Sequence, residues 1–109
     1  GIPIDPPVVA ILHGPGQSDT AEALADELRD RGVNVEVVAE STTGFEQTMV
    51  MPVQSDGSAS RALGELIGVG GFDTWTPSLA ANPLPVNVTD VIILGDDGGP
   101  VLPLPQIGN

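Results

Sequence analysis

The 109-residue sequence contains no cysteine, no lysine and no tyrosine, and it has a single histidine, His13. The absence of cysteine excludes disulfide bonds and thiolate metal sites. Its basic side chains are three arginines, Arg29, Arg31 and Arg61, against fifteen acidic residues, and the formal net charge is −12. Clusters of Lys and Arg are what bind nucleic acids and anionic membrane surfaces. The composition therefore argues against both partners and leaves neutral glycans, zwitterionic peptides and basic proteins.

Long hydrophobic runs are also lacking. The longest apolar stretches, residues 8–12 and 91–94, are far too short to cross a bilayer. No signal peptide is visible, and the chain begins abruptly at Gly1. We therefore expect it to be a piece of a longer protein. Its length suits a single domain.

Hydrophobic spacing predicts the secondary structure. The apolar run 8–12 reads as a strand that ends at the turn His13-Gly14-Pro15-Gly16. Residues 19–31 have the period of an amphipathic helix, with Asp19 and Glu22 as a capping box and Ser18 as a competing cap. Strands are predicted at 33–40, 47–54 and 88–94 and a second helix at 59–67, and residues 72–75 are a candidate short strand.

The order β-α-β-β-α-β predicts an α/β (α+β) fold, a two-layer sandwich with both helices on one face of a mixed or antiparallel sheet. Alternation along 33–40 predicts an open, wet second face. The strands at 8–12 and 91–94 are apolar on both sides. The second face of the sheet is therefore expected either to expose apolar side chains there or to be covered by the tail or a partner. Pro52 indicates a sheet edge. Residues 1–7 are expected to be a linker, 8–97 the domain and 98–109 a proline-rich tail.

Four stretches in this order carry a family resemblance: VVAILHG at 8–14, RGV at 31–33, TMVMPV at 48–53 and VIILGD at 91–96. With them the chain resembles the LytR C-terminal domain family, which accompanies LytR/CpsA/Psr (LCP) phosphotransferases and some standalone envelope proteins. The resemblance covers residues 8–97. It implies an extracytoplasmic location in a Gram-positive or actinobacterial cell envelope, with membrane anchoring through an N-terminal segment outside this sequence. It also implies that any glycopolymer transfer to peptidoglycan belongs to another domain.

Four groups of residues are candidates for binding or catalytic chemistry. Nucleophilic catalysis would need a base beside a nucleophile, and His13 near Ser18 fits a hydrogen-bonded turn histidine better. The turn Gly14-Pro15-Gly16 precedes a helix but lacks the lysine and glycine spacing of phosphate-binding loops. Asp96 and Asp97, with Asp90 nearby, fit a solvated turn better than a Ca²⁺ site. Trp75 could stack on a sugar ring if exposed, although core packing is favoured.

The sequence thus predicts a noncatalytic accessory domain that binds a cell-wall glycan, peptidoglycan or an envelope partner protein. The alternative is a structural spacer or self-association module of an LCP-type transferase, pairing through the Pro52 edge or the apolar sheet face. The candidate ligand-binding residues are His13, Gly14, Trp75 and Asp96. No catalytic residue, metal ligand or cofactor is predicted.

Overall fold

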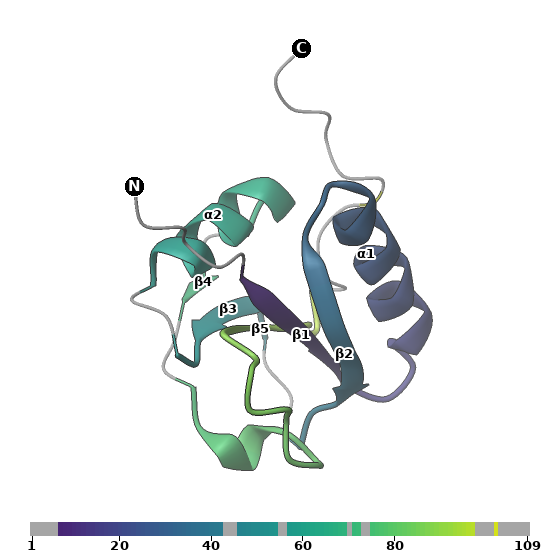
Figure 1. The fold of residues 1–109 in the computed structure, drawn as a ribbon. Coiled ribbons are helices and arrows are strands. Elements are labelled where there is room, and N and C mark those ends of the chain that lie inside the picture. The colour runs from purple at the N-terminus through teal and green to yellow at the C-terminus, as the bar shows by residue number, and fades with distance from the viewer. Residues whose placement is uncertain are drawn as a thin grey trace.

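The computed structural model describes residues 7–42, 46–54, 57–69, 71–72, 75–97 and 102. Five strands and two α-helices, with one short 3₁₀-helix η1, follow each other along these residues (Figure 1). Their bounds are β1 Val8–His13, α1 Ser18–Asp30, β2 Asn34–Glu40, β3 Met49–Pro52, α2 Ser58–Ile67, β4 Gly71–Phe72, η1 Pro77–Leu79 and β5 Asp90–Ile93. The two-residue strand β4 overlaps the candidate short strand at 72–75 and adds a fifth strand to the order β-α-β-β-α-β.

The sheet is mixed, with the strand order β2-β1-β5-β3-β4. β1 is parallel to β2 and β5, β3 is parallel to β4, and only the β3–β5 pair is antiparallel. The units β1-α1-β2 and β3-α2-β4 therefore run in opposite directions and step toward opposite edges. Two right-handed crossovers related in this way place their helices on the same face. Both helices do cover one face, as predicted.

The helix-side core lies between this face and the two helices. Ala21, Leu24, Ala25 and Leu28 of α1 are fully buried, as their helical spacing predicts. Together with α2 they pack on strand residues in one cluster, whose strand members include Val9, Ile11, Val35, Val50 and Ile92. α2 ends at Gly68, whose left-handed conformation (φ 77°) is the usual helix stop.

The second face of the sheet is covered, which corrects the expectation of an open one. Residues 75–89, here called the strap, cross it as the green segment below the sheet in Figure 1. The strap packs against a second apolar cluster on this face, with strap members Trp75, Leu79, Ala80, Leu84 and Val88 and strand members Ala10, Leu12, Met51, Val91 and Ile93. The strands that are apolar on both sides are thus buried on both sides.

A register shift in β2 overturns the predicted alternation. Val35 pairs with Val9, but Val37 pairs with the next residue, Ala10, so Glu36 is an extra residue in β2. A β-bulge of this kind changes the face on which the following side chains lie. Val35 consequently packs on the helix side, whereas Val37 packs on the strap side.

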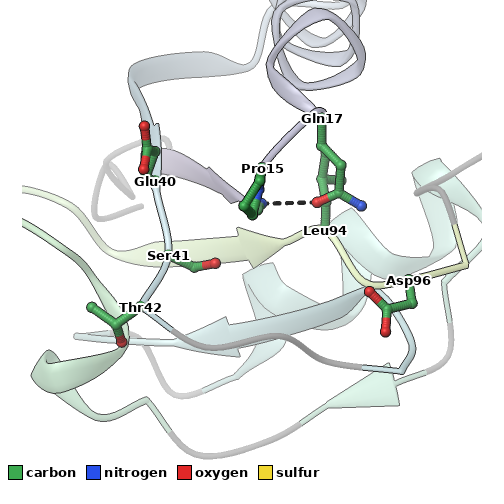
Figure 2. Close-up of a pocket in the computed structure, with 8 residues that line it drawn as sticks. Pro15, Gln17, Glu40, Ser41, Thr42, Leu94 and Asp96 are labelled. Carbon is green, nitrogen blue, oxygen red and sulfur yellow. Dashed lines mark hydrogen bonds between the residues drawn. The ribbon is translucent and has the colours of Figure 1, made fainter.

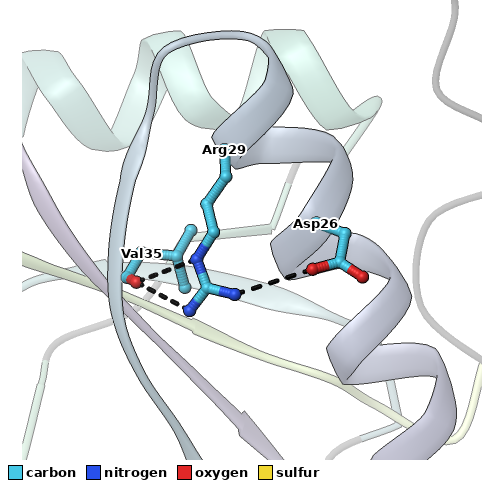
Figure 3. Close-up of polar contacts among 3 residues, drawn as sticks. All are labelled: Asp26, Arg29 and Val35. Atoms are coloured by element: carbon cyan, nitrogen blue, oxygen red, sulfur yellow. Dashed lines mark hydrogen bonds and ion pairs between the residues drawn. The ribbon is translucent and has the colours of Figure 1, made fainter.

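Arg29 ties the last turn of α1 to β2 (Figure 3). Its Nε and Nη2 atoms donate hydrogen bonds to the carbonyl oxygen of Val35, at 3.3 and 2.9 Å. Its Nη1 atom lies 3.6 Å from Asp26 Oδ1, an ion pair whose carboxylate side chain is 76% exposed. The bonded carbonyl sits beside the bulge, where the strand ladder is interrupted. Arg29 thus holds the end of α1 against β2.

The predicted edge at Pro52 is found only in part. β3 lies between β5 and β4, but β4 pairs only with Met49 and Val50, so Pro52 extends beyond that pairing. The predicted linker 1–7 and tail 98–109 lie outside the described residues except for Pro7 and Leu102. Leu102 packs against the helix-side cluster. Within the described ranges, no helix is long and apolar enough to span a bilayer.

Candidate functional site

The carboxyl ends of β1, β2 and β5 lie together at one end of the sheet because these strands are parallel. In open α/β sheets, ligands bind at the carboxyl ends of the strands. A pocket of about 280 Å³ lies there (Figure 2). It is lined by Gly14, Pro15, Gln17, Glu40, Ser41, Thr42, Leu94 and Asp96, all of which directly follow or end a strand or precede α1.

The pocket has a mixed polar and apolar lining and carries negative charge. Figure 2 shows the exposed side chains of Glu40 and Asp96 on opposite sides of it. Ser41 and Thr42 add hydroxyl groups, which donate to the backbone carbonyls of His13 and Ser78, and none of the lining residues is cationic. Carboxylates accept hydrogen bonds, and a hydroxyl whose proton is already engaged still offers its oxygen as an acceptor. The lining is therefore suited to a ligand rich in hydroxyl or amino groups and repels a phosphate or a carboxylate.

Gln17 joins the loops that follow β1 and β5, both of which line the pocket. Its Oε1 atom accepts a hydrogen bond from the Gly14 backbone N–H at 2.8 Å, and its Nε2 atom donates to the Gly95 carbonyl at 2.7 Å. The predicted capping of α1 by Asp19 or Ser18 is wrong: the N-cap residue is Gln17, and it makes no side-chain cap hydrogen bond. Its carboxamide is engaged by the two loops instead.

The loop that follows β5 is fixed against the start of β3. Both carboxylate oxygens of Asp97 accept hydrogen bonds from Thr48, one from its N–H at 3.0 Å and one from its hydroxyl at 2.7 Å. The Thr48 hydroxyl oxygen in turn accepts from the Gly95 N–H at 3.0 Å. Asp97 is therefore more than a solvated turn residue, because it braces the wall of the pocket that Leu94 and Asp96 form.

The structure brings two of the four predicted ligand-binding residues into the pocket, namely Gly14 and Asp96. His13 is buried just beneath it and is absent from the lining. Its Nδ1 atom lies 3.0 Å from the Gly14 carbonyl oxygen, a hydrogen bond that requires the proton on Nδ1. Trp75 is partly buried in the strap-side cluster. The structure therefore places Trp75 in a packed cluster, as the sequence analysis favoured.

The residues that sequence reasoning missed are Pro15, Gln17, Glu40, Ser41, Thr42 and Leu94. A usable signal existed, because three of them, Glu40, Ser41 and Thr42, lie at the end of a strand that the alternation already predicted. The carboxyl ends of neighbouring parallel strands converge, so reading the residues after each strand together would have identified them. Gln17 had no such signal, since its role depends on the distant Gly95.

No three His, Cys, Asp or Glu side chains come together as a metal site within the described part of the chain. Comparisons with family models, with curated proteins and with solved structures found no match.

Proposed function

We propose that this chain is a noncatalytic binding domain of a bacterial cell-envelope protein and that it recognises a cell-wall glycan or peptidoglycan fragment through the pocket at the ends of β1, β2 and β5. The observation that carries the proposal is the chemistry of the lining: two carboxylates and two hydroxyls around a pocket without a cationic residue. Sugar hydroxyls donate hydrogen bonds to such acceptors. The resemblance to the LytR C-terminal domain family supports the same assignment and an extracytoplasmic location.

Two contacts favour binding over nucleophilic catalysis. Nucleophilic catalysis requires a hydroxyl or thiol in hydrogen-bond reach of a base. The Ser41 hydroxyl instead donates to the backbone carbonyl of His13, at 3.3 Å. The His13 Nδ1 atom is engaged by the Gly14 carbonyl. Any phosphotransferase activity would then reside in another domain of the parent protein.

The alternative proposal, a spacer or self-association module, has less support. Of the two surfaces considered for self-association, the apolar sheet face is already covered by the strap. The part of β3 beyond β4, at Pro52, remains for such pairing. An envelope partner protein at the pocket is the other alternative, and a basic surface would fit its charge.

The test is a titration of the ¹⁵N-labelled chain with a muropeptide and with an arabinogalactan oligosaccharide, followed by amide chemical shifts. We expect shifts at the pocket, at Gly14, Gln17, Ser41, Thr42 and Asp96. An absence of shifts with both ligands at about 1 mM, a concentration that detects even weak binding, would discard glycan recognition. Shifts confined to the Pro52 end of β3 at rising protein concentration would support self-association.

Two variants remove one acceptor charge each from the pocket, Glu40→Gln and Asp96→Asn. A hydrogen bond to a charged group contributes about 1.5–3 kcal/mol, so each variant should weaken binding of the active probe by about tenfold or more. Asp30→Asn is the matched control. It removes the same charge from the exposed last residue of α1, at the opposite edge of the sheet, and should leave the affinity unchanged.

A further inference from the structure

We propose that Gln17 is the positioning residue of the pocket: its carboxamide sets the separation of the two walls, and ligand affinity depends on it. These two walls are the loop Gly14–Pro15, which follows β1, and the stretch from Leu94 to Asp96, which follows β5; residues 40–42 at the end of β2 line the remaining side. The dependence of affinity on Gln17 rests on the proposed binding function, whereas the spacing of the walls does not.

The wall after β5 is fixed independently of Gln17. Gly95 has no room to move toward β3, because a Cβ atom there would lie 2.3 Å from the backbone carbon of Gln47. Its N–H is held by Thr48, which is itself held by Asp97. The wall after β5 is therefore part of a rigid frame built on the start of β3.

Gln17 attaches the wall after β1 to this frame. A single carboxamide accepts from the Gly14 N–H and donates to the Gly95 carbonyl, at 2.8 and 2.7 Å. These bonds need opposite ends of the amide, so only a side chain with one acceptor end and one donor end at this length makes both. Gly14 and Gly95 are 81 residues apart in sequence number. Their strands pair directly as far as the hydrogen bond from the Leu94 N–H to the Leu12 carbonyl, and Gln17 continues this link beyond the ladder.

The side chain of Gln17 does not cap α1. Gln17 is the N-cap residue of α1, a position where a side chain commonly bonds to the first turn, yet it makes no such bond. The carboxamide serves the pocket walls instead of the helix. Holding a site in its binding geometry before the ligand arrives raises affinity, because less conformational freedom is lost on binding.

The experiment compares Gln17→Met with Gln17→Glu. Methionine keeps the length of the side chain and removes both hydrogen bonds. Glutamate keeps an acceptor for the Gly14 N–H but turns an oxygen toward the Gly95 carbonyl, where it cannot donate. Arg29→Met is the matched control, because it removes hydrogen bonds that tie the other end of α1 to β2. Each protein is measured for urea stability, for the amide shifts and hydrogen exchange of Gly14 and Gly95, and for affinity toward the muropeptide and the arabinogalactan oligosaccharide.

We expect Gln17→Met to move the Gly14 and Gly95 amide resonances, to speed Gly14 amide exchange and to weaken probe binding by about tenfold or more. Gln17→Glu should retain the slow Gly14 exchange and lose an intermediate amount of affinity. Arg29→Met should lose a comparable amount of stability and keep its affinity within about twofold. A purely structural role for Gln17 would instead make affinity follow stability in all three variants.

The outcomes separate this inference from the proposed function. If the wild-type chain binds a probe and Gln17→Met binds it equally well, Gln17 does not position the pocket and the proposed function stands. If the wild-type chain binds neither probe, the proposed function fails and the claim about affinity fails with it. If the amide shifts and hydrogen exchange of Gly14 and Gly95 are unchanged in Gln17→Met, Gln17 does not set the separation of the walls, whatever the wild-type chain binds.

Discussion

Gly95 marks the closest backbone approach at the end of β5. A Cβ atom at this position would lie 2.3 Å from the carbon, 2.6 Å from the oxygen of the Gln47 carbonyl and 2.7 Å from the Thr48 nitrogen. These are backbone atoms, which cannot turn aside as a side chain can. We predict that Gly95→Ala lowers the free energy of unfolding by roughly 1–3 kcal/mol or more, because overpacking displaces the backbone. Urea denaturation measures this loss.

Gly14→Ala provides the comparison for that prediction. An added Cβ there would meet the Oε1 atom of Gln17 at 3.3 Å, the end of a flexible side chain that can move by a few tenths of an ångström. Gly14→Ala should therefore be less destabilising than Gly95→Ala. Equal stability of Gly95→Ala and the wild-type chain would show that the approach to Gln47 is looser than described.

Asp90 is a fully buried acidic residue at the edge opposite the pocket, with 0% of its surface exposed. Its Oδ1 atom accepts a hydrogen bond from the Ser60 hydroxyl at 2.6 Å, and its Oδ2 atom accepts from the Thr89 hydroxyl at 2.7 Å. These bonds join the first turn of α2, the end of the strap and β5. A buried carboxylate needs such donors. An oxygen left without its partner has lost its hydration on folding without compensation, and this lowers the free energy of unfolding.

We predict that Ser60→Ala destabilises the fold by about 1–3 kcal/mol, even though alanine is the better helix former. The measurement is a double-mutant cycle with Asp90→Asn, in urea. The two substitutions should be non-additive by more than about 0.5 kcal/mol, since the residues are in direct contact. Additive effects would mean that the hydroxyl and the carboxylate contribute independently of each other.

At the scale of elements, the strap closes the sheet face that would otherwise be exposed. Its beginning is held to the end of β2 by the N–H of Thr42, which donates to the Leu79 carbonyl at 2.8 Å. Its end is held to β1 by the Thr89 N–H, which donates to the Val8 carbonyl at 2.8 Å. Between these anchors it contributes apolar side chains to the second cluster. The strap is thus a structural layer and not a free loop.

Two substitutions within the strap test this role. Leu79 is partly buried against the sheet, whereas Val86 is 91% exposed. We predict that Leu79→Ala costs about 1–2 kcal/mol, less than a fully buried leucine would, and that it increases binding of an apolar dye to the uncovered face. Val86→Ala should stay within about 0.5 kcal/mol of the wild-type chain. If both variants behave alike in urea and with the dye, the strap does not close the face.

Some elements are predictable from the sequence and others are not. The spacing of Ala21, Leu24, Ala25 and Leu28 is enough to predict α1 and its buried side, because helical periodicity is a local property. The bulge in β2 is not local: Glu36 is extra only relative to β1, and nothing in the alternation of 33–40 records it. The strap lacks periodicity, so its packing could be inferred only from the double-sided apolar character of β1 and β5.

The strand order is a property of the whole molecule, because no single element determines it. The first β-α-β unit was predictable. The predicted second unit ended in the strand 88–94, whereas the structure ends it at β4 and inserts β5 between β1 and β3. That insertion brings Asp96 to the same edge as Gly14 and Glu40 and so creates the pocket. It also explains why Trp75, grouped with them by chemistry, lies elsewhere. The strap that leads into β5 carries it to the strap-side cluster.

Net charge acts at this scale as well. Fifteen acidic and three basic side chains leave a charge of −12 on a 109-residue chain, and α1 presents exposed acidic residues to solvent, among them Glu22 and Asp30. Folding brings these charges closer together, and their mutual repulsion opposes the compact state. Dissolved salt screens exposed charges, with a Debye length that falls from about 30 Å at 0.01 M to about 10 Å at 0.1 M.

We therefore predict that raising NaCl from about 0.01 M to about 0.3 M stabilises the fold by on the order of 1 kcal/mol, a range in which screening dominates. Thermal unfolding followed by circular dichroism should show a rise in Tm of about 4–8 °C for that change in a domain of this size. The double variant Glu22→Gln/Asp30→Asn should begin with a higher Tm at low salt and rise less, since two of the repelling charges are gone and Asp30 no longer faces the negative end of the α1 dipole. A Tm that is independent of salt in both proteins would mean that the acidic surface is too dispersed to destabilise the fold, and the charge would then matter only for which ligands approach the pocket.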